Sequence, residues 1–343
     1  MAGGDDAPAA AAAFSHVRRH TLDADEHAAC LTSWQQRYDQ LSAGRFDGLF
    51  EEFWFGDVQI FCEELNQTVH QTGKPWPHSR TFAVPVAIEG TGCFGGEVYG
   101  AHSMLTLSGE TELDFRTPPR LKMLACTVDS DALRAFAQHV QRDVEAELKG
   151  RSVVPTSPQQ ITALGALLSA MMSNLQAAPE LLQHAAMRKA IEQGLFETLL
   201  DAASAMRAPA TESPPSLRTR QFVVARAREY MQAHIDEPIT VADLCIELGV
   251  SRRTLQYSFH DVLNLNPVKF LRALRLNAVR RDLRRAGSDG NASVADIAAR
   301  WGFWHQSYFS SEYKAMFGEL PSETLRGKAR DDATQVPSTG GHH

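Results

Sequence analysis

The chain has 343 residues, of which 43% are hydrophobic and 22% are charged, so it can bury the cores of two or three domains and is not a disordered chain. No run of 18 apolar residues is present, and the Ala-rich start carries Asp5 and Asp6 but no basic residue. Neither a membrane span nor a secretory signal is therefore expected. The five cysteines form no C-x-x-C pair, which argues against a disulfide framework or a structural zinc site and favours a cytoplasmic location.

The net charge of −7 is unevenly distributed along the chain. Between Leu217 and Lys328 there are 17 Lys and Arg against 12 Asp and Glu, whereas the rest of the chain holds 17 against 29. A basic C-terminal third on an acidic body is typical of a polyanion-binding module joined to a domain with another task. Chance clustering of charges on a solvated surface is the alternative.

Six segments are predicted in chain order. They are a disordered extension over residues 1–20, a domain of short strands over 21–150, a helical segment over 151–207, a linker with three prolines over 208–216, a basic helical domain over 217–328 and a disordered tail over 329–343. The helical segment carries apolar residues three and four apart, so it packs on a neighbouring domain or forms a dimer seam. The predicted fold class is α+β with several domains.

The strand domain is predicted from apolar runs that alternate with glycine-containing turns. The expected strands are Phe50–Phe55, Val58–Phe61, Phe82–Ile88, Met104–Leu107 and Leu121–Thr127. Short strands of this kind form a small barrel or sandwich, and a cupin-like barrel backed by helices can enclose a small ligand. An amine ligand would need an aromatic wall and a carboxylate, for which the candidates are Trp54, Trp76, Glu51 and Asp57.

Catalysis has no support in the sequence. A cupin-type enzyme would show a His-x-His metal set, but His70, His78 and His102 are not two residues apart. Glu63 and Glu64 are adjacent, so they point to opposite faces of a strand and do not form a carboxylate pair. We expect no catalytic residue, no metal site and no tightly bound cofactor.

The basic C-terminal domain contains an internal repeat. Val241–Leu244 recurs as Val294–Ile297, and Gly249 recurs as Gly302 at the same offset. Each copy predicts a short helix that ends at the glycine and a second helix with a buried stripe. The stripes are Leu255, Phe259 and Leu263 in the first copy and Phe309, Tyr313 and Phe317 in the second. Such a pair of helices forms a helix-turn-helix unit, whose second helix can enter the DNA major groove.

The exposed faces of the two second helices supply the predicted base contacts. They carry Arg252, Arg253, Gln256 and Tyr257 in the first unit and Gln306, Ser307, Tyr308 and Ser311 in the second. Arg suits the O6 and N7 atoms of guanine and Gln suits the N6 and N7 atoms of adenine, so Arg253 and Gln256 are the preferred base readers. For each residue the alternative is a phosphate contact or none.

Between the two units, Pro267–Arg285 predicts a connector helix capped by Asn266. Basic side chains on this helix, with one from the second unit, are predicted to contact DNA phosphates; they are Arg280, Arg281, Arg284, Arg285 and Lys314. A solvated basic face is the alternative for any one of these arginines.

These motifs resemble the AraC family of bacterial transcription regulators. The resemblance covers Val223–Arg326 and is carried by Ser251–Gln256, Trp301–Phe303, Ser307–Ser310, Phe317–Gly318 and Pro321. It implies a sensor domain with a small-molecule effector, helices that pair subunits into a homodimer, and a two-unit domain that binds promoter DNA and acts with RNA polymerase. The family usually has a basic residue at the position of Ser311, so the second unit is expected to read bases weakly or chiefly to grip phosphate.

Within that family, the chain is similar to regulators of ethanolamine utilisation operons. This similarity is carried by Leu31–Leu41, Asp57–Phe61, Trp76–Pro77, Arg275–Arg281 and Trp301–His305. It implies an activator whose effectors are ethanolamine and adenosylcobalamin. The alternatives are a regulator of another catabolic operon with a different effector, a barrel enzyme fused to a DNA-binding module, and a protein that binds DNA constitutively.

Overall fold

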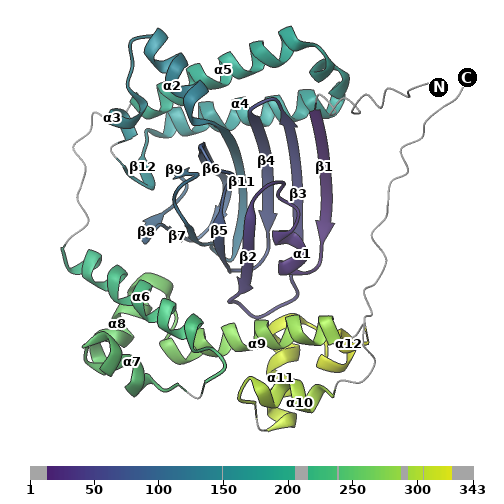
Figure 1. Cartoon of the computed structure of the whole chain (residues 1–343), viewed down its shortest axis with the longest axis vertical. Coiled ribbons are helices and arrows are strands. Elements are labelled where there is room, and N and C mark those ends of the chain that lie inside the picture. Colours follow the sequence, from purple (N-terminus) through teal and green to yellow (C-terminus); the bar gives the residue numbers. More distant parts are fainter. Residues whose placement is uncertain are drawn as a thin grey trace, which may run out of the picture.

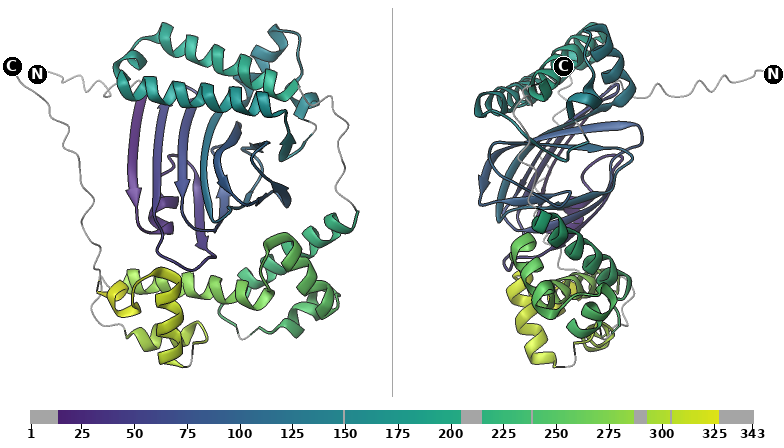
Figure 2. Two further views of the ribbon diagram at one scale, coloured as in Figure 1. Left: turned by 180° about the vertical axis from the view of Figure 1, so that it is seen from behind. Right: turned by 90° about the vertical axis from the view of Figure 1, so that its left-hand side faces the viewer.

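A computed structural model of the chain describes residues 14–148, 150–204, 215–237, 239–286, 293–303 and 305–326. The strands of the N-terminal part lie between two helical layers, one formed by the helices that follow them and one by the C-terminal domain (Figure 1). Figure 2 shows the same arrangement from two further sides. No helix within the described ranges is both long and apolar enough to cross a bilayer.

The strands of the N-terminal domain form two antiparallel sheets. The larger sheet has the order β1 (Phe14–Thr21), β3 (Gly48–Phe55), β4 (Val58–Leu65), β11 (Arg120–Asp129), β6 (Ser79–Glu89), β9 (Ser103–Ser108) and β12 (Val153–Pro155). The smaller sheet has the order β2 (Gln35–Gln40), β5 (Val69–Lys74), β10 (Leu113–Arg116), β7 (Gly92–Phe94) and β8 (Glu97–Tyr99). All five strands expected from the apolar runs lie in the larger sheet.

The cupin-like barrel expected from the sequence is not closed. Among the described strands, the larger sheet ends at β1 and β12 and the smaller sheet at β2 and β8, without a ladder that joins one sheet to the other. The two sheets instead face each other across a shared core, which includes Phe50 and Phe61 of the larger sheet and Phe94 and Phe115 of the smaller one. The domain is therefore a two-sheet sandwich, in which the inner faces of the two sheets pack against each other.

The expectation of a disordered extension over residues 1–20 is wrong for residues 14–20. These residues belong to β1, which pairs with β3 from Phe14 opposite Phe55 to Thr21 opposite Gly48. β1 is an edge strand with mostly exposed side chains, so it lacks the apolar alternation that identifies a half-buried strand. Residues 1–13 of that segment lie outside the described residues.

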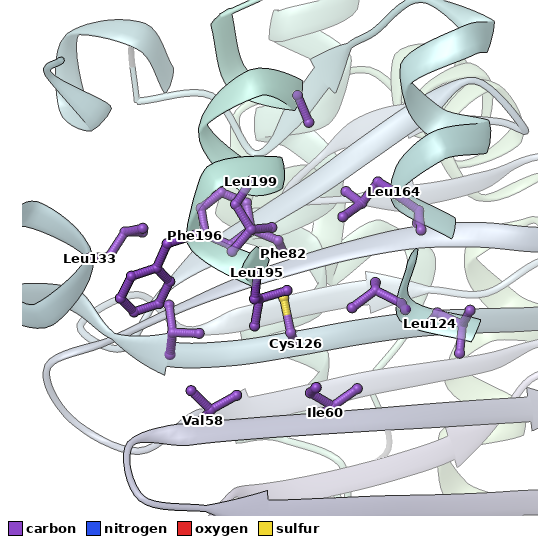
Figure 3. Close-up of a cluster of buried hydrophobic side chains, with 14 of the residues drawn as sticks. Val58, Ile60, Phe82, Leu124, Cys126, Leu133, Leu164, Leu195, Phe196 and Leu199 are labelled. Carbon is purple, nitrogen blue, oxygen red and sulfur yellow. The ribbon is translucent and has the colours of Figure 1, made fainter. Parts of the chain in front are cut away.

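The second core lies on the outer face of the larger sheet. Four helices pack there: α2 (Ser130–His139), α3 (Val144–Leu148), α4 (Pro158–Ala177) and α5 (Ala185–Ser204), with a short 3₁₀ helix over Pro179–Gln183. Leu164 of α4 and Leu195, Phe196 and Leu199 of α5 meet strand residues such as Cys126 (Figure 3). α4 and α5 lie within the segment 151–207 predicted to be helical, but Val153–Pro155 forms strand β12, and residues 205–207 lie outside the described residues. One face of these two helices packs on the sandwich.

The C-terminal domain is built from helices on both sides of one long helix. They are α6 (Pro215–Ala233), α7 (Val241–Leu248), α8 (Arg252–Leu263), α9 (Pro267–Ala286), α10 (Val294–Arg300), α11 (Gln306–Phe317) and α12 (Pro321–Leu325). Both predicted stripes are buried, and residues of the two units join α9 in a single cluster. The cap predicted at Asn266 is present, since Asn266 accepts from the Lys269 N–H, and Ser251 caps α8 by accepting from the Thr254 N–H.

Two of the predicted segments lie partly or entirely outside the residues that the structure describes. Of the linker expected over 208–216, residues 208–214 lie outside the described residues, and Pro215 begins α6. The tail expected over 329–343 lies outside them entirely.

Gly249 ends α7 with φ +61°, and a Cβ at this position would meet nothing within 4 Å. Gly249→Ala is therefore expected to cost about 1–2 kcal/mol of folding free energy through backbone strain alone. Gly194→Ala is the matched control, because Gly194 lies inside α5 with equally open surroundings and no positive φ, so that alanine is tolerated or stabilising there. Urea unfolding of both variants measures the difference, and an unchanged midpoint for Gly249→Ala would contradict this account of the turn.

Candidate DNA-binding surface and its contacts with the strand domain

The first candidate reading helix is α8. Its buried stripe turns Arg252, Arg253, Gln256 and Tyr257 outward, and all four side chains are exposed. The Arg253 guanidinium lies over the Tyr257 ring, 5.2 Å from its centroid. Arg253, Gln256 and Tyr257 also line an open groove of about 600 Å³ that ends at Lys269 of the connector helix. This face offers paired donors and an aromatic edge, which are groups that can read base edges in the DNA major groove.

The second candidate reading helix is α11, and it is less rich in charge. Gln306, Ser307, Tyr308 and Ser311 are exposed, while the Ser311 hydroxyl donates to the Ser307 carbonyl oxygen over 3.0 Å. Tyr308 is held by Arg272 of α9, whose guanidinium lies 5.3 Å from the Tyr308 ring centroid. Arg272 also stacks on Phe303 and forms an ion pair with Glu312. The connector helix thus positions an aromatic side chain on the exposed face of the second unit.

Of the five basic residues that were predicted to contact DNA phosphates, three point toward the strand domain. Arg285 and Lys314 are exposed, with Arg285 Nη1 3.5 Å from Asp282 Oδ1. Arg280, Arg281 and Arg284 instead form ion pairs with carboxylates of the N-terminal domain. These three side chains therefore face carboxylates rather than the outward direction that the predicted phosphate contacts require, because α9 is covered by both helix-turn-helix units and by the strand domain.

The carboxylates that receive these arginines come from α1 (Ala24–Ala28), from the residue that caps it, and from β2. Asp23 Oδ2 lies 2.7 Å from Arg280 Nε, and Asp25 Oδ1 lies 2.9 Å from Arg281 Nε. Burial alone would raise the pKa of Asp23, but the charges of Arg280 and Arg284 and the hydrogen bonds that Asp23 accepts outweigh burial and lower it. Asp23 is therefore held as a buried carboxylate.

A further ion pair joins the strand domain to α6. Arg228 Nη1 donates to both oxygens of Asp114 in β10, at 2.8 and 2.9 Å, and His70 Nε2 lies 3.1 Å from Asp114 Oδ1. Burial alone would raise the pKa of Asp114, but His70 and Arg228 hold it well below its usual range. Because α6 shares a buried cluster with α8, the strand domain is thus tied to the first unit as well as to the connector helix.

The strand domain encloses a small apolar cavity between its two sheets. The cavity has a volume of about 30 Å³, and aromatic rings such as Phe50, Phe61 and Phe115 line it. Its main polar group is Glu63, which accepts hydrogen bonds from Tyr38 Oη (2.7 Å) and Gln71 Nε2 (3.0 Å). Two further lining atoms, Thr106 Oγ1 and Gln36 Oε1, are buried without a hydrogen-bond partner in the part of the chain that the structure describes.

The four residues selected for an amine effector do not form one site. The Trp54 and Trp76 rings are neighbours, with centroids 5.6 Å apart. Glu51 is three residues from Trp54 in β3, so it points to the opposite face of the sheet, where it meets His16 and Gln176. Asp57 is exposed in the turn between β3 and β4. Glu63 was not among the predicted effector residues, although its inward direction follows from its alternation with the half-exposed Glu64.

No cluster of three or more His, Cys, Asp or Glu side chains with a geometry suited to a metal occurs within the described ranges.

Residues 244–327 match the family model of a helix-turn-helix domain. Over 88% of its length the chain is 28% identical to the probable thc operon regulatory protein of Rhodococcus erythropolis, and it covers 87% of that protein. It is 34% identical to the HTH-type transcriptional regulator ArgR of Pseudomonas aeruginosa over 31% of this chain and 32% of that one. Among solved structures, the AraC-like transcriptional activator CuxR superposes with a TM-score of 0.41 and 16% identity, over 77% of this chain and 94% of that one.

The family match falls on the two units that the structure assembles around α9, so the C-terminal domain is a helix-turn-helix DNA-binding domain. This domain follows a strand-rich N-terminal domain, and over most of its length the chain is similar to a probable operon regulatory protein.

Proposed function

We propose that the protein is a ligand-responsive activator that reads promoter DNA mainly with α8. The observation that carries the proposal is the exposed set on the two reading helices, where Arg253, Gln256 and Tyr257 stand beside an open groove. Arg and Gln are the side chains that discriminate guanine and adenine in the major groove. In α11, hydroxyl groups replace charges, which supports a weaker reading role or a phosphate contact for the second unit.

The role of the second unit can be tested by a substitution that is expected to increase the affinity for DNA. Ser311→Arg is expected to strengthen DNA binding and to steepen its salt dependence by about one unit of slope, because it adds a cation to the exposed face of α11. Titrations of the full chain at low and moderate salt measure this. Ser169→Arg, on the exposed face of α4, adds the same charge far from α11 and should leave affinity unchanged. Weaker binding by Ser311→Arg would mean that α11 does not approach DNA.

We further propose that a small-molecule effector binds between the sheets of the strand domain. Support comes from the cavity there, which has a buried carboxylate and two unpartnered polar atoms in an apolar wall. A volume of about 30 Å³ has room for roughly one water, so an effector must widen the cavity, and a corrinoid is far too large for it. The pair implied by the resemblance is ethanolamine with adenosylcobalamin; an effector of another catabolic operon is equally compatible with the cavity.

Thermal unfolding separates these effectors. A ligand that binds the folded protein raises its melting temperature, whereas a constitutive DNA-binding protein shows no shift with any candidate. Ethanolamine, adenosylcobalamin, both together and a panel of small amines and neutral amphiphiles are the probes. An amine that acts through Glu63 should lose its shift in Glu63→Gln and keep it in Glu64→Gln, since Glu64 points away from the cavity.

The homodimer and the contact with RNA polymerase are also part of the proposal. In the structure, α4 and α5 lie on the side of the sandwich opposite the DNA-binding domain, where a second subunit would not obstruct α8 or α11 (Figure 1). Light scattering of the full chain tests the dimer, and transcription from a bound promoter with purified polymerase tests the activator role.

A further inference from the structure

The segment that follows β2 reaches the C-terminal end of α11. The Gly44 N–H donates to the carbonyl oxygens of Ala315 (3.0 Å) and Met316 (3.2 Å), and Gln40 Nε2 donates to the Met316 oxygen (2.7 Å). The last carbonyl groups of a helix have no partner within that helix. The strand domain therefore supplies a cap for the second reading helix.

The same strand is attached to the connector helix. Asn277 of α9 accepts from the Gln40 N–H over 3.0 Å and donates to the Gln40 carbonyl oxygen over 2.8 Å, and both residues are buried. Arg281 also donates to the Tyr38 carbonyl oxygen over 2.7 Å. Since β2 is an edge of its sheet, α9 satisfies backbone groups that would otherwise have no strand beside them.

Charge complementarity extends this contact along α9. Arg280, Arg281 and Arg284 face Asp23, Asp25, Glu26 and Asp39, and Arg281 Nη2 lies 2.8 Å from the fully buried Asp39. We call these seven residues, with Gln40, Gly44 and Asn277, the interdomain clamp. Figure 1 shows α1 and β2 on the side of the strand domain that faces α9.

The clamp and the candidate base readers lie at different ends of α11. The clamp holds Ala315 and Met316, whereas Gln306, Ser307, Tyr308 and Ser311 occupy the N-terminal half of the helix and are exposed. On α8 the base readers are exposed too, although the first unit is tied to the strand domain through Arg228 and Asp114. DNA can thus approach both reading helices while the domains are docked.

We propose that the clamp is a splint: the docked strand domain fixes the second helix-turn-helix unit relative to the first, and so sets the distance between the two reading helices. This inference rests on the proposed DNA-binding function for its consequence, but the clamp itself is a property of the free protein. A change in the strand domain reaches the DNA-binding surface through Gln40, the last residue of β2, and through Gly44 in the segment after it. Both residues donate hydrogen bonds to carbonyl oxygens of α11.

Hydrogen exchange of the DNA-free full chain tests the clamp. Glu26→Lys places a cation against Arg284, so amides in the last turn of α11 and the second half of α9 should exchange about tenfold faster. In an Arg284→Ala background, the same substitution should have less than half of that effect, since the repelled partner is gone. Glu180→Lys is the matched control, because it makes the same charge change at an exposed site behind the sandwich. Exchange like that of the control would overturn the clamp.

The splint is tested with a DNA duplex that the full chain selects from a library of random sequences. Glu26→Lys should weaken binding to this duplex by about the same factor as it speeds exchange, and should have little effect when one half of the site is randomised. Unchanged or tighter binding by a variant whose exchange has risen would overturn the splint and indicate an inhibitory contact. Failure to recover any duplex would count against the proposed function, while the exchange experiment would still decide whether the clamp exists.

Discussion

Arg253→Ala in the full chain is expected to lower affinity for the specific DNA site by about 1–3 kcal/mol, which is roughly 5- to 150-fold. The Arg253 side chain is exposed on α8 beside Tyr257, where it can donate two hydrogen bonds to a guanine. The affinity for random DNA should fall much less, because a base-edge contact adds no binding free energy where the matching base is absent. Titration of specific and random duplexes at two salt concentrations measures both quantities.

Two arginines provide controls for that experiment. Arg226 is exposed on α6 and pairs with Glu229 in the same helix, so Arg226→Ala should leave sequence discrimination unchanged. Arg284 faces Asp23 and Glu26, so Arg284→Ala should not reduce the salt slope in the way that loss of a phosphate contact would. If Arg253→Ala weakens specific and random binding equally, α8 is not the base reader.

Arg280→Ala is expected to destabilise the full chain by about 1.5–3 kcal/mol, the typical contribution of hydrogen bonds to charged groups, because it removes one of the two arginines that compensate the buried Asp23. Arg280 is 8% exposed, bridges Asp23 (2.7 Å) and Glu319 (3.0 Å), and stacks on Phe317. The substitution leaves the buried Asp23 with Arg284 alone. Urea unfolding at neutral pH measures the loss, and Arg300→Ala is the control, since Arg300 is exposed and its contact with Asp282 is 4.0 Å long.

The same pair predicts a pH dependence of stability. The pKa of Asp23 is lower in the folded protein than its ordinary value of 3.8, so the folded state binds fewer protons there than the unfolded state. The stabilisation is complete above the unfolded pKa and is lost as the pH falls below about 4. The difference in stability between the wild type and Arg280→Ala should therefore shrink on acidification. A difference that stays constant from pH 7 to pH 3 would contradict the role of this ion pair.

The helix-turn-helix domain was predictable from the sequence because its signals are local. Serine caps begin α8 and α10, a glycine follows the end of α7, α10 and α11, and apolar residues recur three and four apart in the helices. The same periodicity determines which side chains face outward, so Arg253 and Gln256 could be selected without knowledge of the tertiary structure. The central strands β3, β4, β6, β9 and β11 were predictable for a similar reason, because their apolar runs reflect burial.

The sequence by itself thus determined the two helix-turn-helix units, their exposed faces and the presence of a strand-rich domain. The tertiary structure decided the rest, because it depends on partners far apart in the chain. Arg281 and Asp25 are 256 residues apart, and a basic helix surface has the same sequence pattern whether phosphates or carboxylates neutralise it. Edge strands such as β1 are likewise set by backbone hydrogen bonds between strands that are distant in the sequence, and so is the pairing that leaves the barrel open. Every residue type can form these backbone hydrogen bonds, so the sequence carries no specific signal for them.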